Sequence, residues 1–266
     1  ASATPTADAT ASATPTATTQ RPADAYSAHV ATEWFKLFVQ LTQRAPGFSP
    51  PVAARAYGYA GVALYEALVA GMPGYQSLSG QLTDMPPMPA PPPGADLYWP
   101  AVANAALATI ARDLFPTISD TPLRLTNRLE AKLDAEIAAA LGVDAAPALL
   151  EASRLYGRSV AEALFAWSRT DGGHEGYMHN VSAGYVQPAG EGLWVPTPPD
   201  YAPPLQPAWG ENRRMAPVAG ETCAAPPPPE YSTEPTSQFY KEAREVYDTV
   251  RGLTEEQEEI AHYWSD

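Results

Sequence analysis

The feature that most constrains this fold is the spacing of apolar residues, which follows the period of an α-helix in most of the segment between the N-terminal tail and residue 173. Val30, Trp34, Leu37, Phe38 and Leu41, for example, fall on one face of a helix. Similar patterns predict helices at about 24–44, 51–71, 96–114, 121–141 and 147–170. None of this region shows the alternation typical of strands. We therefore predict an all-α fold with a helical bundle of about five helices over 23–173.

Local signals mark where these helices begin and end. Ser49 followed by Pro50 and Pro51 supplies an N-cap and first-turn prolines, and Gly142 follows the fourth helix. The segment 51–71, PVAARAYGYAGVALYEALVAG, is apolar almost all round. We therefore expect this second helix to be the central one, buried on most sides.

Residues 174–235 lose the helical pattern and become rich in proline. Thirteen of the 30 prolines lie between 188 and 235. Flexible linkers are poor in aromatic residues, but this segment holds Tyr177, Tyr185, Trp194, Tyr201, Trp209 and Tyr231. We therefore predict a long, extended arm that packs its aromatic side chains onto a surface and whose prolines lower the entropy cost of ordering.

Two C-terminal helices are predicted within 236–266. The second opens with a capping box at Thr254 and Gln257, and Ile260 and Trp264 form an apolar pair that should be buried. No Gly, Asn or Pro ends this helix. We therefore expect this pair of helices to be incomplete and to continue in a longer protein.

Composition narrows the partners and the location. The net charge of −14 and the scattered basic residues argue against binding to nucleic acid or to an anionic membrane surface. No apolar run is long enough to be a transmembrane segment. Residues 1–22 form an Ala/Thr/Ser/Pro tail in which ASATPTA occurs at 1–7 and 11–17. This tail is predicted to be disordered, either as a plain tail or as the stalk of an exported protein tethered to the cell envelope. We expect export to the periplasm, the cell surface or the medium.

The single cysteine, Cys223, excludes an intrachain disulfide. Cys223 is therefore interpreted as an inert loop thiol, with an intermolecular bridge as the alternative. Asn180-Val181-Ser182 also fits a glycosylation sequon, a pattern that is common by chance.

The loop after the fifth helix, DGGHEGYMHN, holds the residues that could bind a metal ion. His174, Glu175 and His179 are the candidates, but the histidines are five residues apart rather than the four of helical zinc sites. Asp171, Glu175 and Asn180 could supply oxygen ligands for calcium, without the regular ligand pattern of a calcium-binding loop. A polar loop without a metal is the simpler interpretation.

Arg213 and Arg214, which follow Trp209, could bind an anion. The alternative is that one or both fix the arm to carboxylates of the bundle.

Several short motifs then occur in a fixed order and carry a family resemblance. They are Arg55, ALYEA (63–67), LFP (114–116), RTDG (169–172), LWVPTPP (193–199), AWG (208–210) and TEEQEEIAHYW (254–264). Over about 24–266, the chain resembles the N-terminal half of bacterial vanadium-dependent haloperoxidase-like proteins, in the superfamily of type-2 phosphatidic acid phosphatases. The resemblance implies an all-α fold of two packed bundles, in which a lysine, two arginines and two histidines hold vanadate or bind phosphate.

The resemblance implies that the anion site is marked by a lysine followed by Arg-Pro and by a Ser-Gly-His, and both of these marks are absent from this sequence. There is no Ser-Gly-His, and the one Arg-Pro, at Arg21, lies in the tail. The resemblance therefore assigns no catalytic residue and no cofactor to this chain, and it implies vanadate only if a missing half is present. We predict a chain that is inactive alone and whose apolar face is covered by the missing C-terminal half or by another protein chain. The alternative is a non-catalytic structural subunit of a cell-envelope or membrane-associated assembly.

Overall fold

The computed structural model describes residues 21–115, 120–142, 147–181, 184–216 and 225–264. It places them in two compact units, one formed by 1–180 with 208–216, and the other by 181–207 with 217–266. The expectations for the tail at 1–20, for Cys223 and for the serine of the sequon fall outside the described residues.

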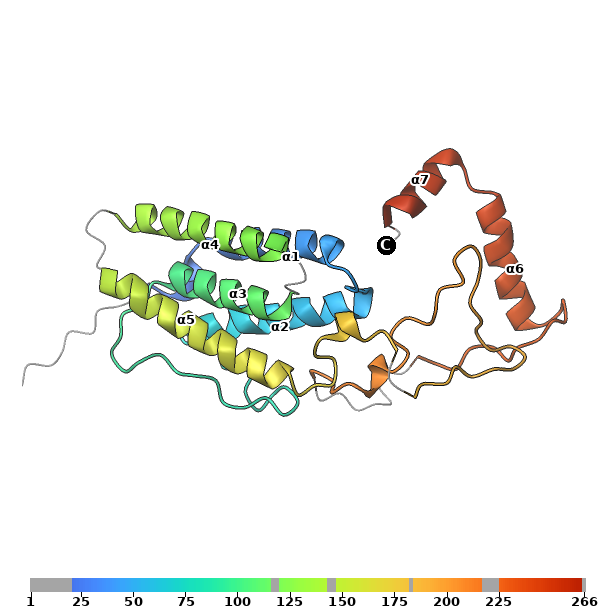
Figure 1. Cartoon of the computed structure of the whole chain (residues 1–266), viewed down its shortest axis with the longest axis horizontal. Coiled ribbons are helices and arrows are strands. Elements are labelled where there is room, and N and C mark those ends of the chain that lie inside the picture. Colours follow the sequence, from blue (N-terminus) through green and yellow to red (C-terminus); the bar gives the residue numbers. More distant parts are fainter. Residues whose placement is uncertain (1–20, 116–119, 143–146, 182–183, 217–224, 265–266) are drawn as a thin grey trace, which may run out of the picture. The chain divides into compact units, whose positions relative to one another are not determined.

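The described part of the first unit is a helical bundle (Figure 1). Its α-helices are α1 (His29–Arg44), α2 (Pro50–Val69), α3 (Trp99–Leu114), α4 (Asp120–Leu141) and α5 (Pro147–Ser168), and its 3-10 turns are η1 (Ala23–Ala25), η2 (Gly176–Met178) and η3 (Trp209–Glu211). The described residues contain helices and no strands, so the prediction of an all-α fold is confirmed. The predicted first helix, at about 24–44, begins too early. Residues 23–25 form the separate turn η1, and α1 begins only at His29.

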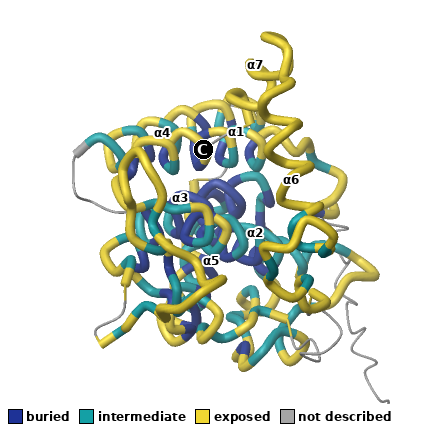
Figure 2. The backbone as a smooth tube through the Cα atoms, turned by 90° about the vertical axis from the view of Figure 1, so that its right-hand side faces the viewer, coloured by how far each residue is buried: buried dark blue, intermediate teal, exposed yellow. Residues whose placement is uncertain are grey.

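The central helix of the bundle is α3, and the prediction that the second helix is central was wrong. Helix α3 contacts α1, α2, α4 and α5, and its tube is dark blue, the colour of buried residues, in Figure 2. Twelve of its 16 residues are buried, compared with nine of the 20 residues in α2. Alanines make up much of α3, and their small side chains let several helices approach one axis closely.

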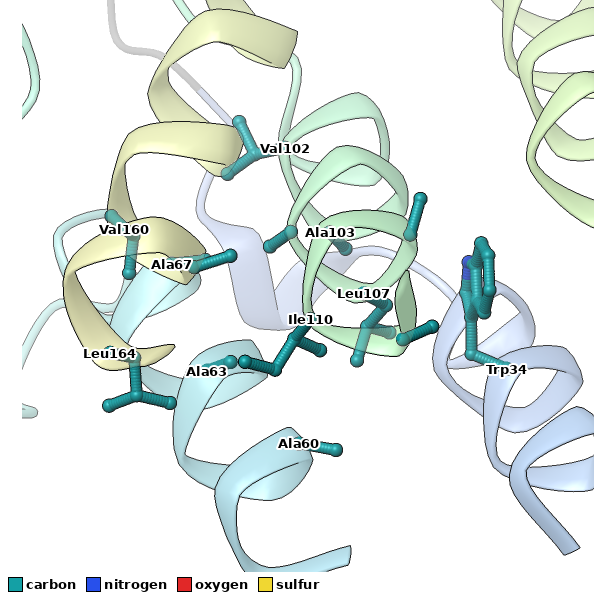
Figure 3. Packing of buried hydrophobic residues seen from close by; sticks show 14 of the residues in the cluster. Trp34, Ala60, Ala63, Ala67, Val102, Ala103, Leu107, Ile110, Val160 and Leu164 are labelled. Atoms are coloured by element: carbon teal, nitrogen blue, oxygen red, sulfur yellow. The ribbon is translucent and has the colours of Figure 1, made fainter. Parts of the chain in front are cut away.

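Small residues set the closest contacts of this core. A Cβ atom added to Gly157 of α5 would lie 2.3 Å from the carbonyl oxygen of Val102 in α3. Figure 3 shows α3 side chains such as Leu107 and Ile110 packed among α2 alanines, Leu164 of α5 and Trp34 of α1. The bundle is therefore held by close helix packing around α3.

One fully buried polar residue links three of the helices. The Asn104 side chain in α3 accepts a hydrogen bond from Trp34 Nε1 at 2.8 Å. It donates to the Glu130 carbonyl oxygen at 3.2 Å and to Asp134 Oδ1 at 2.9 Å, both in α4. Each end of the amide is thus satisfied, which removes the cost of burying it.

Buried Glu66 of α2, which belongs to the ALYEA motif, organises the loop that follows this helix. Its Oε1 accepts a hydrogen bond from the Leu78 backbone N–H at 2.6 Å, and its Oε2 accepts one from Ser77 Oγ at 2.8 Å. Because both carboxylate oxygens are occupied, this motif residue has a structural role.

The second unit contains α6 (Gln238–Arg251) and α7 (Glu255–Trp264), neither of which has a buried residue. The predicted capping box is present: Thr254 N–H donates to Gln257 Oε1 at 3.0 Å, and Gln257 N–H donates to Thr254 Oγ1 at 3.3 Å. Ile260 and Trp264, however, are 53% and 78% exposed, so the burial expected for this pair does not occur within the second unit.

The arm residues of the second unit contact one another but bury little. The Tyr231 ring packs against Gly192 and lies edge-on to Phe239, with ring centres 5.1 Å apart. Trp194 is 52% exposed, so its expected packing against a surface is not seen in this unit. None of the described helices is both long and apolar enough to cross a membrane.

Candidate functional site

A cavity of about 250 Å³ opens at one end of the first unit. Its walls come from the beginning of α2, the ends of α3 and α5, and the loop at 173–177. It combines aromatic rings with charged side chains, and its lining residues are Phe48, Val52, Arg55, Ala56, Asp113, Leu114, Phe165, Arg169, Gly173, His174, Glu175, Gly176 and Tyr177.

The polar centre beside this cavity is Asp171, whose side chain is 5% exposed. Arg55 Nε donates to Asp171 Oδ2 at 2.7 Å, and Arg55 Nη2 donates to Oδ1 at 3.2 Å. The Tyr59 hydroxyl donates to Oδ2 at 2.9 Å and the Gly173 N–H to Oδ1 at 2.8 Å. The bidentate contact between Arg55 and Asp171 suits the planar guanidinium. It joins two side chains that are 116 residues apart in the sequence.

Burial keeps the phenol next to Asp171 protonated. Burial is the largest cause that raises the pKa of Tyr59 to about 12, and the negative charge of Asp171 adds to it. The Tyr59 hydroxyl therefore remains a hydrogen-bond donor to the carboxylate at a more alkaline pH than an exposed tyrosine would.

The segment around Arg213 binds to the residues at 167–171, next to the Asp171 carboxylate. Its backbone N–H donates to the Asp171 carbonyl oxygen at 2.7 Å. Its guanidinium donates to Thr170 Oγ1 at 2.7 Å and to the Trp167 carbonyl oxygen at 2.9 Å, and lies over the Trp167 ring. Arg213 thus fixes its segment to the bundle, in agreement with the second of the two interpretations given for Arg213 and Arg214. Its side-chain partners are a carbonyl oxygen, a hydroxyl and a ring, however, and not the carboxylates that were expected.

Two charged side chains that line the cavity, Asp113 and Arg169, do not take part in such contacts. Among the described residues, neither Asp113 nor Arg169 has a side-chain hydrogen bond or ion pair. Asp113 is partly buried, and Arg169 is exposed. Burial, followed by the nearby charge of Glu162, raises the pKa of the Asp113 carboxyl.

The predicted metal candidates are only partly brought together. His174 and Glu175 line the cavity, with His174 Nε2 3.7 Å from Glu175 Oε1, but His179 is not among the lining residues. Within the described ranges, no group of three or more His, Cys, Asp or Glu side chains could hold a metal ion. The carboxylate of Asp171, a suggested calcium ligand, instead accepts hydrogen bonds from Arg55, Tyr59 and Gly173. The fold therefore brings two of the three suggested metal ligands, His174 and Glu175, to the cavity.

Sequence reasoning missed Asp113 and Tyr59, and it treated Arg169 and Asp171 only as parts of the RTDG motif. The available signals were weak: Asp113 lies one residue before LFP, and Tyr59 lies one helical turn after Arg55.

The cavity does not fit vanadate. An oxyanion needs several uncommitted cationic donors, but of the two arginines that line the cavity Arg55 is already paired with Asp171, which leaves Arg169 alone. Asp113 and Glu175 would add negative charge next to the anion. No step of vanadium chemistry is therefore assigned to these residues.

Comparison with known proteins relates this fold to one class. No protein-family model matches the chain, and no curated protein matches it. A solved structure, described as that of the first bacterial vanadium-dependent iodoperoxidase, matches with a TM-score of 0.67 and 29% sequence identity. The match covers 87% of this chain and 54% of that chain, so this chain spans about half the length of the iodoperoxidase. The fold is haloperoxidase-like.

Proposed function

We propose that this chain is the helical scaffold half of a haloperoxidase-like protein and is inactive by itself. The match that covers most of this chain but only 54% of the iodoperoxidase carries the proposal. The ion pair between Arg55 and Asp171 also supports the proposal, because these motif residues hold the bundle together. The half of the fold that this chain does not match would then supply the anion-binding lysine, arginines and histidines.

The second unit would be the part that meets this other half. Val246 and Val250 of α6 are 64% and 60% exposed, and Trp264 of α7 is 78% exposed. Apolar helix faces of this kind are costly in water and mark a surface that another element covers. Vanadate-dependent halide oxidation, or phosphate-ester hydrolysis, would belong to the assembled protein.

The Ala/Thr/Ser/Pro tail supports a proposed location outside the cytoplasm, tethered to the cell envelope. Fractionation of the source cells, followed by immunoblotting, tests this. Detection in the cytoplasm alone would contradict it.

Mass measurement of the protein isolated from its native source tests the scaffold proposal. The expected result is a polypeptide much larger than 28.3 kDa, or a companion chain that carries a Ser-Gly-His segment. A species of 28.3 kDa with no such companion would overturn the proposal. A species of that mass, bound to envelope proteins that lack the segment, would instead support the alternative of a structural subunit.

A further inference from the structure

We propose that the cavity at the end of the bundle binds a small organic cation with an apolar body, such as a primary arylalkyl amine. This site is separate from the anion chemistry discussed above and does not depend on the scaffold proposal. The charges, the walls and the rigidity of the cavity support this site.

The charges favour a cation. Arg55 is neutralised by Asp171, which leaves two carboxylates in the cavity, Asp113 and Glu175, against the exposed Arg169 and His174, whose Nε2 lies 3.7 Å from Glu175 Oε1. The charge of Glu162 raises the pKa of the Asp113 carboxyl more than the charge of Arg112 lowers it, so negative charge predominates near Asp113. A bound ammonium group would relieve both this repulsion and the partial burial of an unpaired carboxylate.

The walls favour an apolar body attached to the cation. The rings of Phe48, Phe165 and Tyr177 line the cavity, and they offer apolar surface to the body of the ligand. A volume of about 250 Å³ restricts the ligand to a small molecule of roughly one ring and a short chain.

The loop that closes the cavity is already held in place. The Tyr177 ring stacks on Phe48 with ring centres 5.7 Å apart. The Tyr177 carbonyl oxygen is so close to Gly47 that a Cβ atom there would lie 2.0 Å from it. Trp209 packs on Gly176 from the segment that Arg213 fixes. Binding would therefore require little ordering of the walls, which favours affinity.

Calorimetric titration of the full chain near neutral pH with three ligands of matched body tests the charge preference. The ligands are 2-phenylethylamine, 2-phenylethanol and 3-phenylpropionate. We expect saturable binding of the amine in the millimolar range or tighter, with the alcohol and the carboxylate weaker by at least about tenfold. Equal or tighter binding of the carboxylate, or no saturable binding of the amine, would overturn the proposal.

Two cavity variants and one control locate the binding. Asp113→Asn and Glu175→Gln should each weaken amine binding by about tenfold or more. Asp96→Asn, which removes an exposed carboxylate outside the cavity lining, should leave it unchanged. Asp113→Asn should not lower the thermal unfolding temperature, because it removes an unpaired, partly buried charge. Amine binding that survives both cavity variants would place the ligand elsewhere and refute the site.

Discussion

Replacing Asp171 by Asn should unfold the bundle at a markedly lower denaturant concentration. The substitution keeps the volume of the side chain but removes its charge. Arg55, whose side chain is 11% exposed, would then be a nearly buried cation without its counter-charge. Removing one partner of a buried ion pair costs about 3–5 kcal/mol. That is a large share of the roughly 5–15 kcal/mol by which a domain is stable.

Urea unfolding followed by far-UV circular dichroism measures this loss. A cost of about 4 kcal/mol, with a slope of about 2 kcal/mol per molar urea, lowers the midpoint by roughly 2 M. The matched control is Asp96→Asn at an exposed position, which should change stability by less than about 0.5 kcal/mol.

A double-mutant cycle separates the ion pair from a general effect of substitution. Arg55→Leu combined with Asp171→Asn removes the uncompensated cation, so the double variant should be more stable than Asp171→Asn alone. A loss below about 1 kcal/mol for Asp171→Asn, or strict additivity in the cycle, would show that the Asp171 contacts do not hold the bundle together.

Two further predictions concern the core. Gly157→Ala should destabilise the bundle by about 1–3 kcal/mol in the same unfolding assay, because its Cβ would overlap the Val102 carbonyl oxygen, whereas Gly61→Ala, with open space around its Cβ, should not destabilise it. The pKa values of Tyr59 and Tyr156 are raised to about 12, mainly by burial. The contribution of each raised pKa to the free energy of unfolding is therefore fully present below about pH 10 and is lost as the pH rises towards 12. The loss is up to about 3 kcal/mol for each tyrosine. Tyr59→Phe should reduce this alkaline loss in thermal melts, and an unchanged pH profile would contradict the assignment.

The helices could be predicted from the sequence because their signals are local. Apolar spacing and the positions of Pro and Gly predicted five bundle helices whose ends, apart from the start of the first, lie close to those observed, and the capping box at Thr254 was predicted from residue types alone. The central helix could not be chosen in this way. Residues 51–71 looked more apolar, but burial depends on how many neighbours surround a helix, and that is a property of packing rather than of one segment.

The candidate site was predicted even less well, for a similar reason. The motifs that contain Arg55 and Asp171 were recognised, but nothing in their spacing indicates that the two side chains meet across 116 residues. The metal interpretation of His174, Glu175 and His179 relied on closeness in sequence, and the fold places only two of them at the cavity.

Iodide oxidation by the purified chain, with hydrogen peroxide and orthovanadate, tests the central claim most directly. We expect the rate of triiodide formation to equal the rate of the same mixture without protein, at every vanadate concentration. A protein-dependent rate that saturates with vanadate would show that these 266 residues hold a working anion site, and it would contradict the scaffold assignment.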